Sequence, residues 1–407
     1  MADVNIIIRA KVLIDGLGGP PIRQGLMAIA GEKIAYVGAA ASAPAFPSEA
    51  QVIDLPDATL LPGLIDMHCH PTFYYEEPDL ATYTDDYDGV STYPPAMVAL
   101  LAAGNIRKAL LSGMTTLRDT GSVNDIMFDV RRAVKKGLIP GPRLYLSGRL
   151  IIPTGGDCHN LAGLSNQADG PHDFRRAVRE EVRTGADFIK IANDKQDLTQ
   201  EELNAAVDEA HRLEKKVCCH TIWHPSQRMA IEAGVDTFEH GTPTPEEIDL
   251  AAQKGITWTP TINMSQEYLK WYEQQSKHSD PGIAHTAQQG YASQKQYLEQ
   301  KHASMEYALK AGLRIVAGTD SFMRDVRFDA LPDEIRTLVD YGCSPMQAIQ
   351  AATSWAAESM GWEDIGTLQP GKAADVIALA GNPLEDIHAL DKVTLVISYG
   401  NVVKKQP

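Results

Sequence analysis

Apolar and polar residues follow two different patterns along this chain, and the pattern changes near residues 60 and 365. The first stretch holds short β-type segments, including 6–15 and a hairpin over 25–38 that turns at Gly31. The last stretch, 365–407, has the same character. Two β-rich ends around a long middle section predict one small β-sandwich domain, built from residues 1–60 and 365–407.

The middle section alternates strand-like and helix-like patterns. Thr199 followed by Glu202 is the capping-box signature of a helix start. Repeated strand–helix units with buried, parallel-type strands are typical of an α/β fold. Eight such units close a (β/α)8 TIM barrel, which we predict over residues 61–364. A polar, helical insertion over 263–311 is predicted to lie as a lid above it. The strand-like runs lie at 186–191, 216–220, 237–240, 256–261 and 314–320.

One apolar strand ends with His68 and His70, two residues apart. Side chains at this spacing on a strand point the same way, so the two imidazoles form half of a chelate. Imidazole nitrogens suit a borderline ion such as zinc better than magnesium or calcium. From the spacing alone, a strand end with two chance histidines explains the pattern equally well.

Four more residues of ligand type lie at or next to the carboxyl ends of predicted strands: Lys190, His220, His240 and Asp320. Each alone has an ordinary explanation, such as a helix N-cap for Asp320 or a solvated side chain for Lys190. The catalytic groups of a (β/α)8 barrel gather at this same rim. Six such residues on one rim favour a site over coincidence.

Composition narrows the class of protein. The 407 residues accommodate a barrel and a smaller unit, and 44% hydrophobic with 22% charged residues is ordinary for a globular enzyme. A net charge of −16, spread along the sequence, disfavours nucleic acid and anionic membranes as partners. Five cysteines without framework spacing argue against a disulfide scaffold. With no signal peptide pattern and no membrane span, we expect a cytoplasmic protein with a small-molecule substrate; a homo-oligomer is compatible with the sequence.

Several sequence features stand out along the chain: ProGlyLeuIleAspMetHisCysHis (62–70), GlyMetThrThrLeuArgAspThrGly (113–121), PheIleLysIle (188–191), His220, PheGluHisGly (238–241) and AlaGlyThrAsp (317–320). Together they resemble the amidohydrolase superfamily, in the branch of imidazolonepropionase-like and Xaa-Pro dipeptidase-like proteins. The likeness covers essentially the whole chain. It implies metal-dependent hydrolases on a barrel with an added β-sandwich.

The resemblance also implies a ligand set. His68, His70 and Asp320 would hold one divalent metal ion, and His220 and His240 a second, with Zn²⁺ expected at both. Lys190, carboxylated by CO2, would bridge them, since a carbamate offers anionic oxygens where an ammonium would repel the metals. A hydroxide between the metals would attack the amide or peptide-type C–N bond of an N-acyl amino acid or dipeptide-like substrate. Asp320 would pass its proton to the departing nitrogen.

Substrate contacts are less defined. The dipeptidase-like branch tends to carry ThrGlyGlyHis, where this chain has ThrGlyGlyAspCysHisAsn and its histidine, His159, is displaced by two positions. That branch also tends to have a tyrosine where Ile222 stands. His159 is a candidate for contacting the substrate carbonyl, with a structural turn histidine as the alternative. Asp119 either supports the ligands or caps its strand.

Side chains near the rim suggest what the substrate looks like. Aromatic residues from Phe73 to Tyr93 suit an apolar or ring-bearing group, although a solvated loop with stray tyrosines is the alternative. Arg118 and Arg324 are the weak candidates for binding a carboxylate.

Three other functions remain open. One is opening of a cyclic amide by a single metal, as in imidazolonepropionase-like enzymes, which generally lack the bridging lysine. Another is ester, lactone or phosphotriester hydrolysis at the same site. The last is a non-catalytic scaffold, against which the complete ligand set argues.

Overall fold

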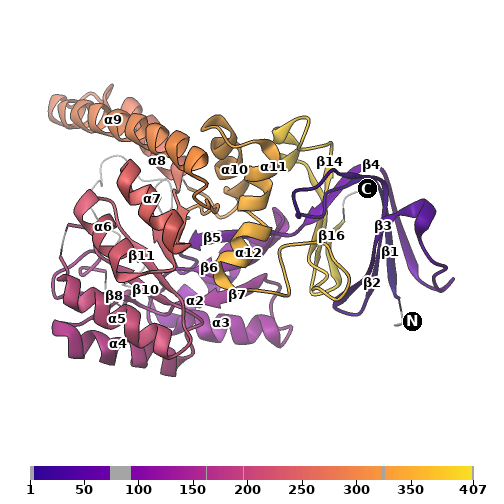
Figure 1. Cartoon of the computed structure of the whole chain (residues 1–407), viewed down its shortest axis with the longest axis horizontal. Coiled ribbons are helices and arrows are strands. Elements are labelled where there is room, and N and C mark those ends of the chain that lie inside the picture. Colours follow the sequence, from indigo (N-terminus) through magenta and orange to yellow (C-terminus); the bar gives the residue numbers. More distant parts are fainter. Residues whose placement is uncertain (1–3, 74–92, 162, 196, 322–325, 406–407) are drawn as a thin grey trace.

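The chain forms two bodies with different kinds of sheet (Figure 1). The computed structural model describes residues 4–73, 93–161, 163–195, 197–321 and 326–405. A β-rich body contains both ends of the chain. The larger α/β body contains the middle of the sequence, with helices around parallel strands.

The β-rich body is one seven-stranded sheet in the order β16-β15-β14-β4-β1-β2-β3. Because β4 pairs in parallel with β1 and antiparallel with β14, it joins the two ends of the chain. The two halves of this sheet share a core that includes Ile8, Met27 and Val376; the β-sandwich form of the domain stays a prediction. The strands are β1 (Ile6–Leu13), β2 (Ile22–Ala30), β3 (Lys33–Ala39), β4 (Gln51–Pro62), β14 (Val376–Ala380), β15 (Val393–Ser398) and β16 (Asn401–Lys405).

The α/β body contains two parallel sheets, ordered β5-β6-β7 and β13-β12-β11-β10-β8-β9. Their strands are short and largely buried, which is typical of strands that helices cover. They are β5 (Leu64–Cys69), β6 (Met114–Asp119), β7 (Arg143–Leu146), β8 (Leu150–Ile152), β9 (Ser165–Gln167), β10 (Ile189–Ala192), β11 (Val217–His220), β12 (Thr237–Glu239) and β13 (Thr257–Thr259).

Backbone hydrogen bonds link the two parallel sheets at two places. On one side, the Asp187 amide donates to the Leu146 carbonyl across 2.8 Å, from the start of β10 to the end of β7. On the other side, residues 314–321 run between β13 and β5. There the Val316 amide donates to Trp258, and the Asp320 amide donates to His68 across 2.7 Å. The predicted strand over 314–320 therefore bridges the sheets without forming a regular strand itself.

Helices follow most of the parallel strands, as the alternating pattern predicted. The helix after β10 begins behind Thr199, whose hydroxyl and the Glu202 side chain form the predicted capping box. The helices are α2 (Pro95–Leu111), α3 (Ile126–Lys135), α4 (Gly170–Thr184), α5 (Gln200–Arg212), α6 (His224–Ala233), α7 (Pro245–Lys254), α8 (Ile262–Gln275), α9 (Pro281–Ala311), α10 (Leu331–Asp340), α11 (Pro345–Ala351) and α12 (Ser354–Met360). Within the described residues, no helix combines the length and apolarity that a membrane crossing requires.

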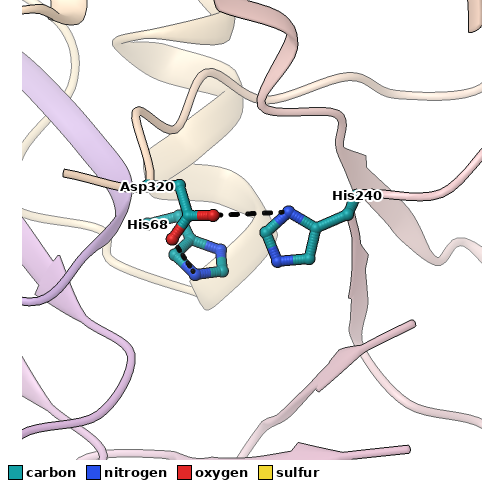
Figure 2. A group of neighbouring side chains, drawn as sticks. All are labelled: His68, His240 and Asp320. Atoms are coloured by element: carbon teal, nitrogen blue, oxygen red, sulfur yellow. Dashed lines mark ion pairs between the residues drawn. The ribbon is translucent and has the colours of Figure 1, made fainter. Parts of the chain in front are cut away.

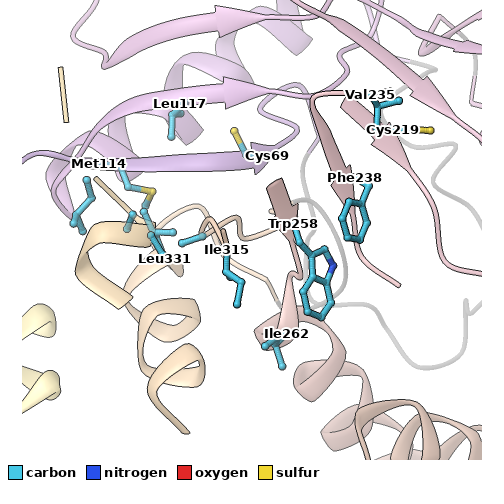
Figure 3. Close-up of a cluster of buried hydrophobic side chains, with 14 of the residues drawn as sticks. Cys69, Met114, Leu117, Cys219, Val235, Phe238, Trp258, Ile262, Ile315 and Leu331 are labelled. Carbon is cyan, nitrogen blue, oxygen red and sulfur yellow. The ribbon is translucent and has the colours of Figure 1, made fainter. Parts of the chain in front are cut away.

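The core of the α/β body lies between the strands and their helices (Figure 3). Phe238 and Trp258, on neighbouring strands, stack with ring centroids 6.0 Å apart and are fully buried. Cys69 packs in this core, on the opposite face of β5 from its histidine neighbours, as strand alternation predicted. The same alternation sends every second side chain of these strands toward the interior of the body, where the polar residues gather.

Candidate active site

Three predicted ligands from distant parts of the chain meet in the α/β body (Figure 2). His68 comes from β5, His240 follows β12, and Asp320 ends the bridging segment 314–321. Their ligand atoms lie within 4.8 Å of one another, and all three side chains are buried. Two imidazoles and a carboxylate at this spacing form a group that can hold a metal ion.

Asp320 lies against both histidines of β5. Its Oδ1 is 3.3 Å from His68 Nε2 and 3.4 Å from His70 Nε2, and these two nitrogens are 3.2 Å apart. His70 Nδ1 lies 2.8 Å from the Gly121 carbonyl, which can only accept a hydrogen bond. The proton of a neutral His70 therefore sits on Nδ1, and the lone pair of Nε2 points at the other two groups.

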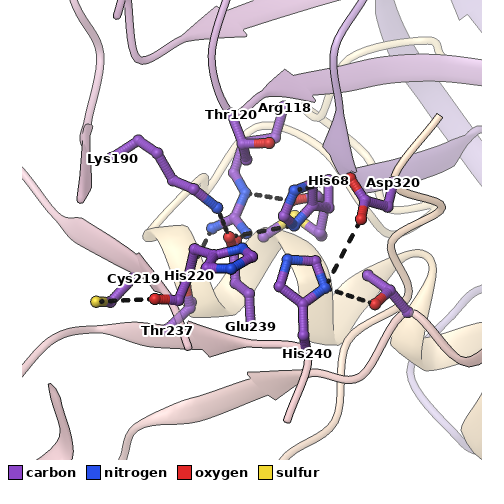
Figure 4. Close-up of polar contacts among 12 residues, drawn as sticks. His68, Arg118, Thr120, Lys190, Cys219, His220, Thr237, Glu239, His240 and Asp320 are labelled. Atoms are coloured by element: carbon purple, nitrogen blue, oxygen red, sulfur yellow. Dashed lines mark hydrogen bonds and ion pairs between the residues drawn. The ribbon is translucent and has the colours of Figure 1, made fainter. Parts of the chain in front are cut away.

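The remaining two predicted ligands are His220, which lies next to His240, and Lys190, which reaches Glu239 (Figure 4). The rings of His220 and His240 have centroids 4.6 Å apart. Lys190 is buried, and its Nζ contacts Oε2 of Glu239. All six predicted residues, His68, His70, Lys190, His220, His240 and Asp320, line a single cavity of about 370 Å³.

Burial sets the charge of these groups. It lowers the pKa of His68 and of His240 well below the usual range, so both imidazoles are neutral and able to donate a lone pair. Burial also lowers the pKa of Lys190.

Two of the candidate ligands have unusual backbone conformations. His240 has φ of 64° and Asp320 has φ of 56°, both in the left-handed region that side chains other than glycine rarely adopt. Such conformations persist where the surrounding structure imposes them, and they concentrate at functional sites. Gly318 allows the bridging segment to approach β5, because a Cβ there would lie only 2.8 Å from the Cβ of His68.

A buried carboxylate that the sequence analysis missed lies beneath the site. Glu239 is fully buried; its Oε1 is 2.5 Å from Arg118 Nη2, and its Oε2 is 3.1 Å from His68 Nδ1 and also contacts Lys190. Removing one partner of such a buried ion pair typically costs about 3–5 kcal/mol of stability. The available signal was strand alternation: Glu239 and Thr237 share the face opposite Phe238, so a charge there must find an interior partner.

Arg118 is that partner and does not serve the substrate. Its guanidinium is fully buried and donates to the Met67 carbonyl, to Thr237 Oγ1 across 3.1 Å and to Glu239. The weak expectation that Arg118 binds a substrate carboxylate is therefore wrong. Arg324, the other candidate for binding a substrate carboxylate, lies outside the described residues.

Asp66 is a second residue that the sequence analysis missed. Its carboxylate accepts hydrogen bonds from the backbone amides of His68 and Thr319, each across 3.0 Å, and from the Thr319 hydroxyl across 2.6 Å. It thus ties together the two segments that carry His68 and Asp320. Burial raises the pKa of Asp66 to about 6.

The predicted substrate contacts have different surroundings. His159 is exposed, and its Nδ1 lies 2.9 Å from the Gly156 carbonyl, while its neighbours Asp157 and Asn160 line the cavity. A catalytic role for His159 stays a prediction. Asp119 accepts hydrogen bonds from the Gly121 amide and the Ser122 hydroxyl at the end of β6, as a strand cap would. Most of the aromatic stretch, 74–92, lies outside the described residues.

Comparison with known proteins identifies the family. A sequence model of the amidohydrolase family matches residues 59–403. The chain belongs to this family. Ochratoxinase from Aspergillus niger is 31% identical over 438 residues, which cover 98% of this chain and 86% of that protein. Its crystal structure matches with a TM-score of 0.83 and 28% identity, covering 99% of this chain and 96% of the other.

A crystal structure of a Xaa-Pro dipeptidase with methionine bound in its active site is similar to the same degree. The TM-score is 0.82 at 30% identity, and the match covers 98% of this chain and 99% of the dipeptidase. Membership of this family and the similarity to these relatives show that the protein is a hydrolase of amide-type C–N bonds. They also show a TIM-barrel fold with an additional domain. The predicted superfamily and reaction class are confirmed, and so is the coarser fold prediction of a TIM-barrel type with an additional domain.

Proposed function

We propose that this amidohydrolase uses two divalent metal ions, with Zn²⁺ expected, to cleave the amide bond of a small N-acyl amino acid or dipeptide-like substrate. His68, His70 and Asp320 would hold one ion, and His220 and His240 the other. Lys190, once carboxylated, would bridge them. The observation that carries this proposal is that all six side chains line one cavity.

The donor set fits zinc, which takes imidazole nitrogens and carboxylate oxygens readily. The protein fixes which imidazole nitrogen is available: His70 Nδ1 lies at the Gly121 carbonyl and His240 Nδ1 at the Thr261 hydroxyl, so each Nε2 is left with its lone pair. Lys190 is fully enclosed, and conversion of its amine to a carbamate would supply the anionic oxygens that a pair of dications requires.

In this proposal the metals would acidify a water molecule and polarise the scissile carbonyl. Asp320 Oδ1 is 3.3 Å from His68 Nε2, and Oδ2 is 3.8 Å from His240 Nδ1. The carboxylate therefore lies between a residue proposed for the first ion and a residue proposed for the second. From there it would accept the proton of the attacking water and deliver it to the leaving nitrogen. Glu239 and Asp66 would hold His68 in place during the reaction.

The cavity wall supports a substrate with an apolar group. The cavity is also lined by Leu150, Leu161 and Leu164, together with Ile222 and Met264. Apolar walls with a few convergent polar groups are typical of small-molecule sites. We therefore expect an acyl or amino-acid side chain of aliphatic or aromatic type to face this wall.

We also propose that the parallel strands and the bridging segment 314–321 close into one (β/α)8 barrel. The hydrogen bonds that join β7 to β10 and β13 to β5 support closure. The pairing of β4 with β14 supports a separate composite β domain at residues 1–60 and 365–407.

A substrate panel with controlled metal content tests the proposed function. Zinc-loaded enzyme should hydrolyse linear N-acyl amino acids or dipeptides with apolar side chains faster than matched lactams. Chelation with dipicolinate should remove the activity, and added Zn²⁺ should restore it, with two ions bound per chain. Turnover that survives complete metal removal would contradict the proposal. Turnover confined to lactams, with one ion per chain, would favour the cyclic-amide alternative.

A further inference from the structure

The segment after β13 is held by charged side chains from two helices that the catalytic proposal does not use. Lys301 on α9 is fully buried, and its Nζ donates to the Pro260 carbonyl across 2.6 Å. The Nζ also lies 4.8 Å from the centroid of the Tyr297 ring. Burying a charge costs free energy unless hydrogen bonds or an opposite charge offset the loss of hydration. Pro260, whose carbonyl accepts the Lys301 hydrogen bond, directly precedes Thr261.

The second charged side chain is Glu334 on α10, which is also fully buried. Its two carboxylate oxygens accept hydrogen bonds from the Ile262 amide across 3.0 Å and the Asn263 amide across 2.7 Å. These are the first amides of α8, which have no partner within their own helix. A carboxylate at a helix N-terminus satisfies those donors and interacts favourably with the helix dipole.

Glu334 thereby takes over the task that the N-cap residue of a helix usually performs. Thr261 is the N-cap of α8, yet its hydroxyl makes no capping hydrogen bond. The residue has φ of 48°, and its hydroxyl instead donates to the Pro260 carbonyl across 2.8 Å. Its oxygen lies 2.7 Å from His240 Nδ1. With the hydroxyl proton committed to Pro260, the oxygen accepts the Nδ1 proton of His240.

We propose that Glu334 and Lys301 are positioning residues for His240: together they fix the turn at 260–263, so that Thr261 holds His240 with Nε2 free to bind metal. The inference rests on the proposed function for the role of His240. Burial lowers the pKa of Lys301 to about 7 and raises that of Glu334 to about 7, and each opposes the shift of the other. Lys301 belongs to the helical insertion over 263–311, which therefore holds the turn beside His240; a lid role for this insertion stays a prediction.

The test is the protonation of His240 in metal-free protein, read by NMR with ¹⁵N-labelled histidine. A His240→Gln variant identifies the signal among the 12 histidines. In the wild type we expect the proton on Nδ1. In Glu334→Ala the Thr261 hydroxyl is free to cap α8, so we expect His240 to show a mixture of both tautomers. Zinc affinity, measured by chelator competition, should fall about 10- to 100-fold, as it does when partners of metal ligands are lost.

Three further variants make the result decisive. Thr261→Val should reproduce the tautomer change, and Lys301→Met should weaken zinc binding in the same direction. Glu334→Gln keeps one acceptor oxygen, so its His240 tautomer and its zinc affinity should be closer to those of the wild type than in Glu334→Ala. The control is Glu273→Ala, which removes an exposed carboxylate from α8 itself, paired only with Lys277 among its described ion pairs.

The inference would be overturned by one result: a folded Glu334→Ala variant that keeps the His240 proton on Nδ1 and binds zinc as tightly as Glu273→Ala does. If Glu334→Ala does not fold, Thr261→Val and Lys301→Met decide by the same two readouts. If the wild type binds no zinc, the proposed function fails, whereas the tautomer of His240 in metal-free protein still tests the role of this turn.

Discussion

Replacing Asp320 with Asn should reduce amide hydrolysis about 100- to 10,000-fold, the range that general acid–base groups contribute. The substitution keeps the shape of the side chain but removes the carboxylate that lies 3.3 Å from His68 Nε2 and 3.4 Å from His70 Nε2. An amide cannot carry the proton from the attacking water to the leaving nitrogen. The measurement is kcat on zinc-loaded protein, with metal content determined on the same sample.

Asp173→Asn is the matched control for this change. Asp173 is about half exposed on α4 and pairs with Arg176, so its loss should leave kcat unchanged. A variant Asp320→Asn that retained more than about a tenth of wild-type kcat, with full metal content, would remove Asp320 from proton transfer.

Replacing Lys190 with Ala should also remove most of the activity, and short carboxylates such as acetate or propionate should partly restore it. The side chain is buried within the ligand cavity, so its removal leaves a space beside His220 and His240 that a small carboxylate can fill. A carboxylate there supplies the anionic oxygens that the carbamate would provide. The measurement is kcat against carboxylate concentration, together with the number of zinc ions per chain.

Lys310→Ala serves as the control, since Lys310 is exposed near the end of α9 and pairs with Glu306. Carboxylates should have no effect on it. Full activity of Lys190→Ala without any additive would exclude a bridging role for this lysine.

The six ligand-type residues could be predicted because two simple rules apply to them. Strand alternation places His68 and His70 on one face, and a parallel α/β body brings the ends of its strands together. Their separation in sequence, from 68 to 320, is therefore no obstacle: the cavity contains all six. The capping box at Thr199 was similarly local and is confirmed.

The supporting residues could not be predicted in the same way. Glu239 and Arg118 are 121 positions apart and lie on strands of different sheets, and they pair because both side chains point into the interior. Asp66 stands within an apolar strand pattern that gives no sign of a partner, yet its carboxylate joins that strand to Thr319. Nothing in the local pattern around Glu334 shows that it caps a helix beginning some 70 residues earlier.

Backbone geometry limited the prediction elsewhere. The bridging segment 314–321 makes strand-like hydrogen bonds on both sides, but Asp320 takes a left-handed conformation that ends the regular pattern. In the β-rich body, period-two alternation predicted strands correctly but carried no information on β4 pairing with strands on both sides. The pattern therefore did not predict that β4 joins both ends of the chain in one sheet.

The most direct test of the account is anomalous X-ray diffraction from crystals of zinc-loaded enzyme, with data collected above and below the zinc absorption edge. We expect two anomalous peaks per chain in the cavity, one beside His68, His70 and Asp320 and one beside His220 and His240, with density for a carbamate on Lys190 between them. A fully loaded protein with its zinc bound elsewhere, or with no anomalous peak in this cavity, would contradict the account.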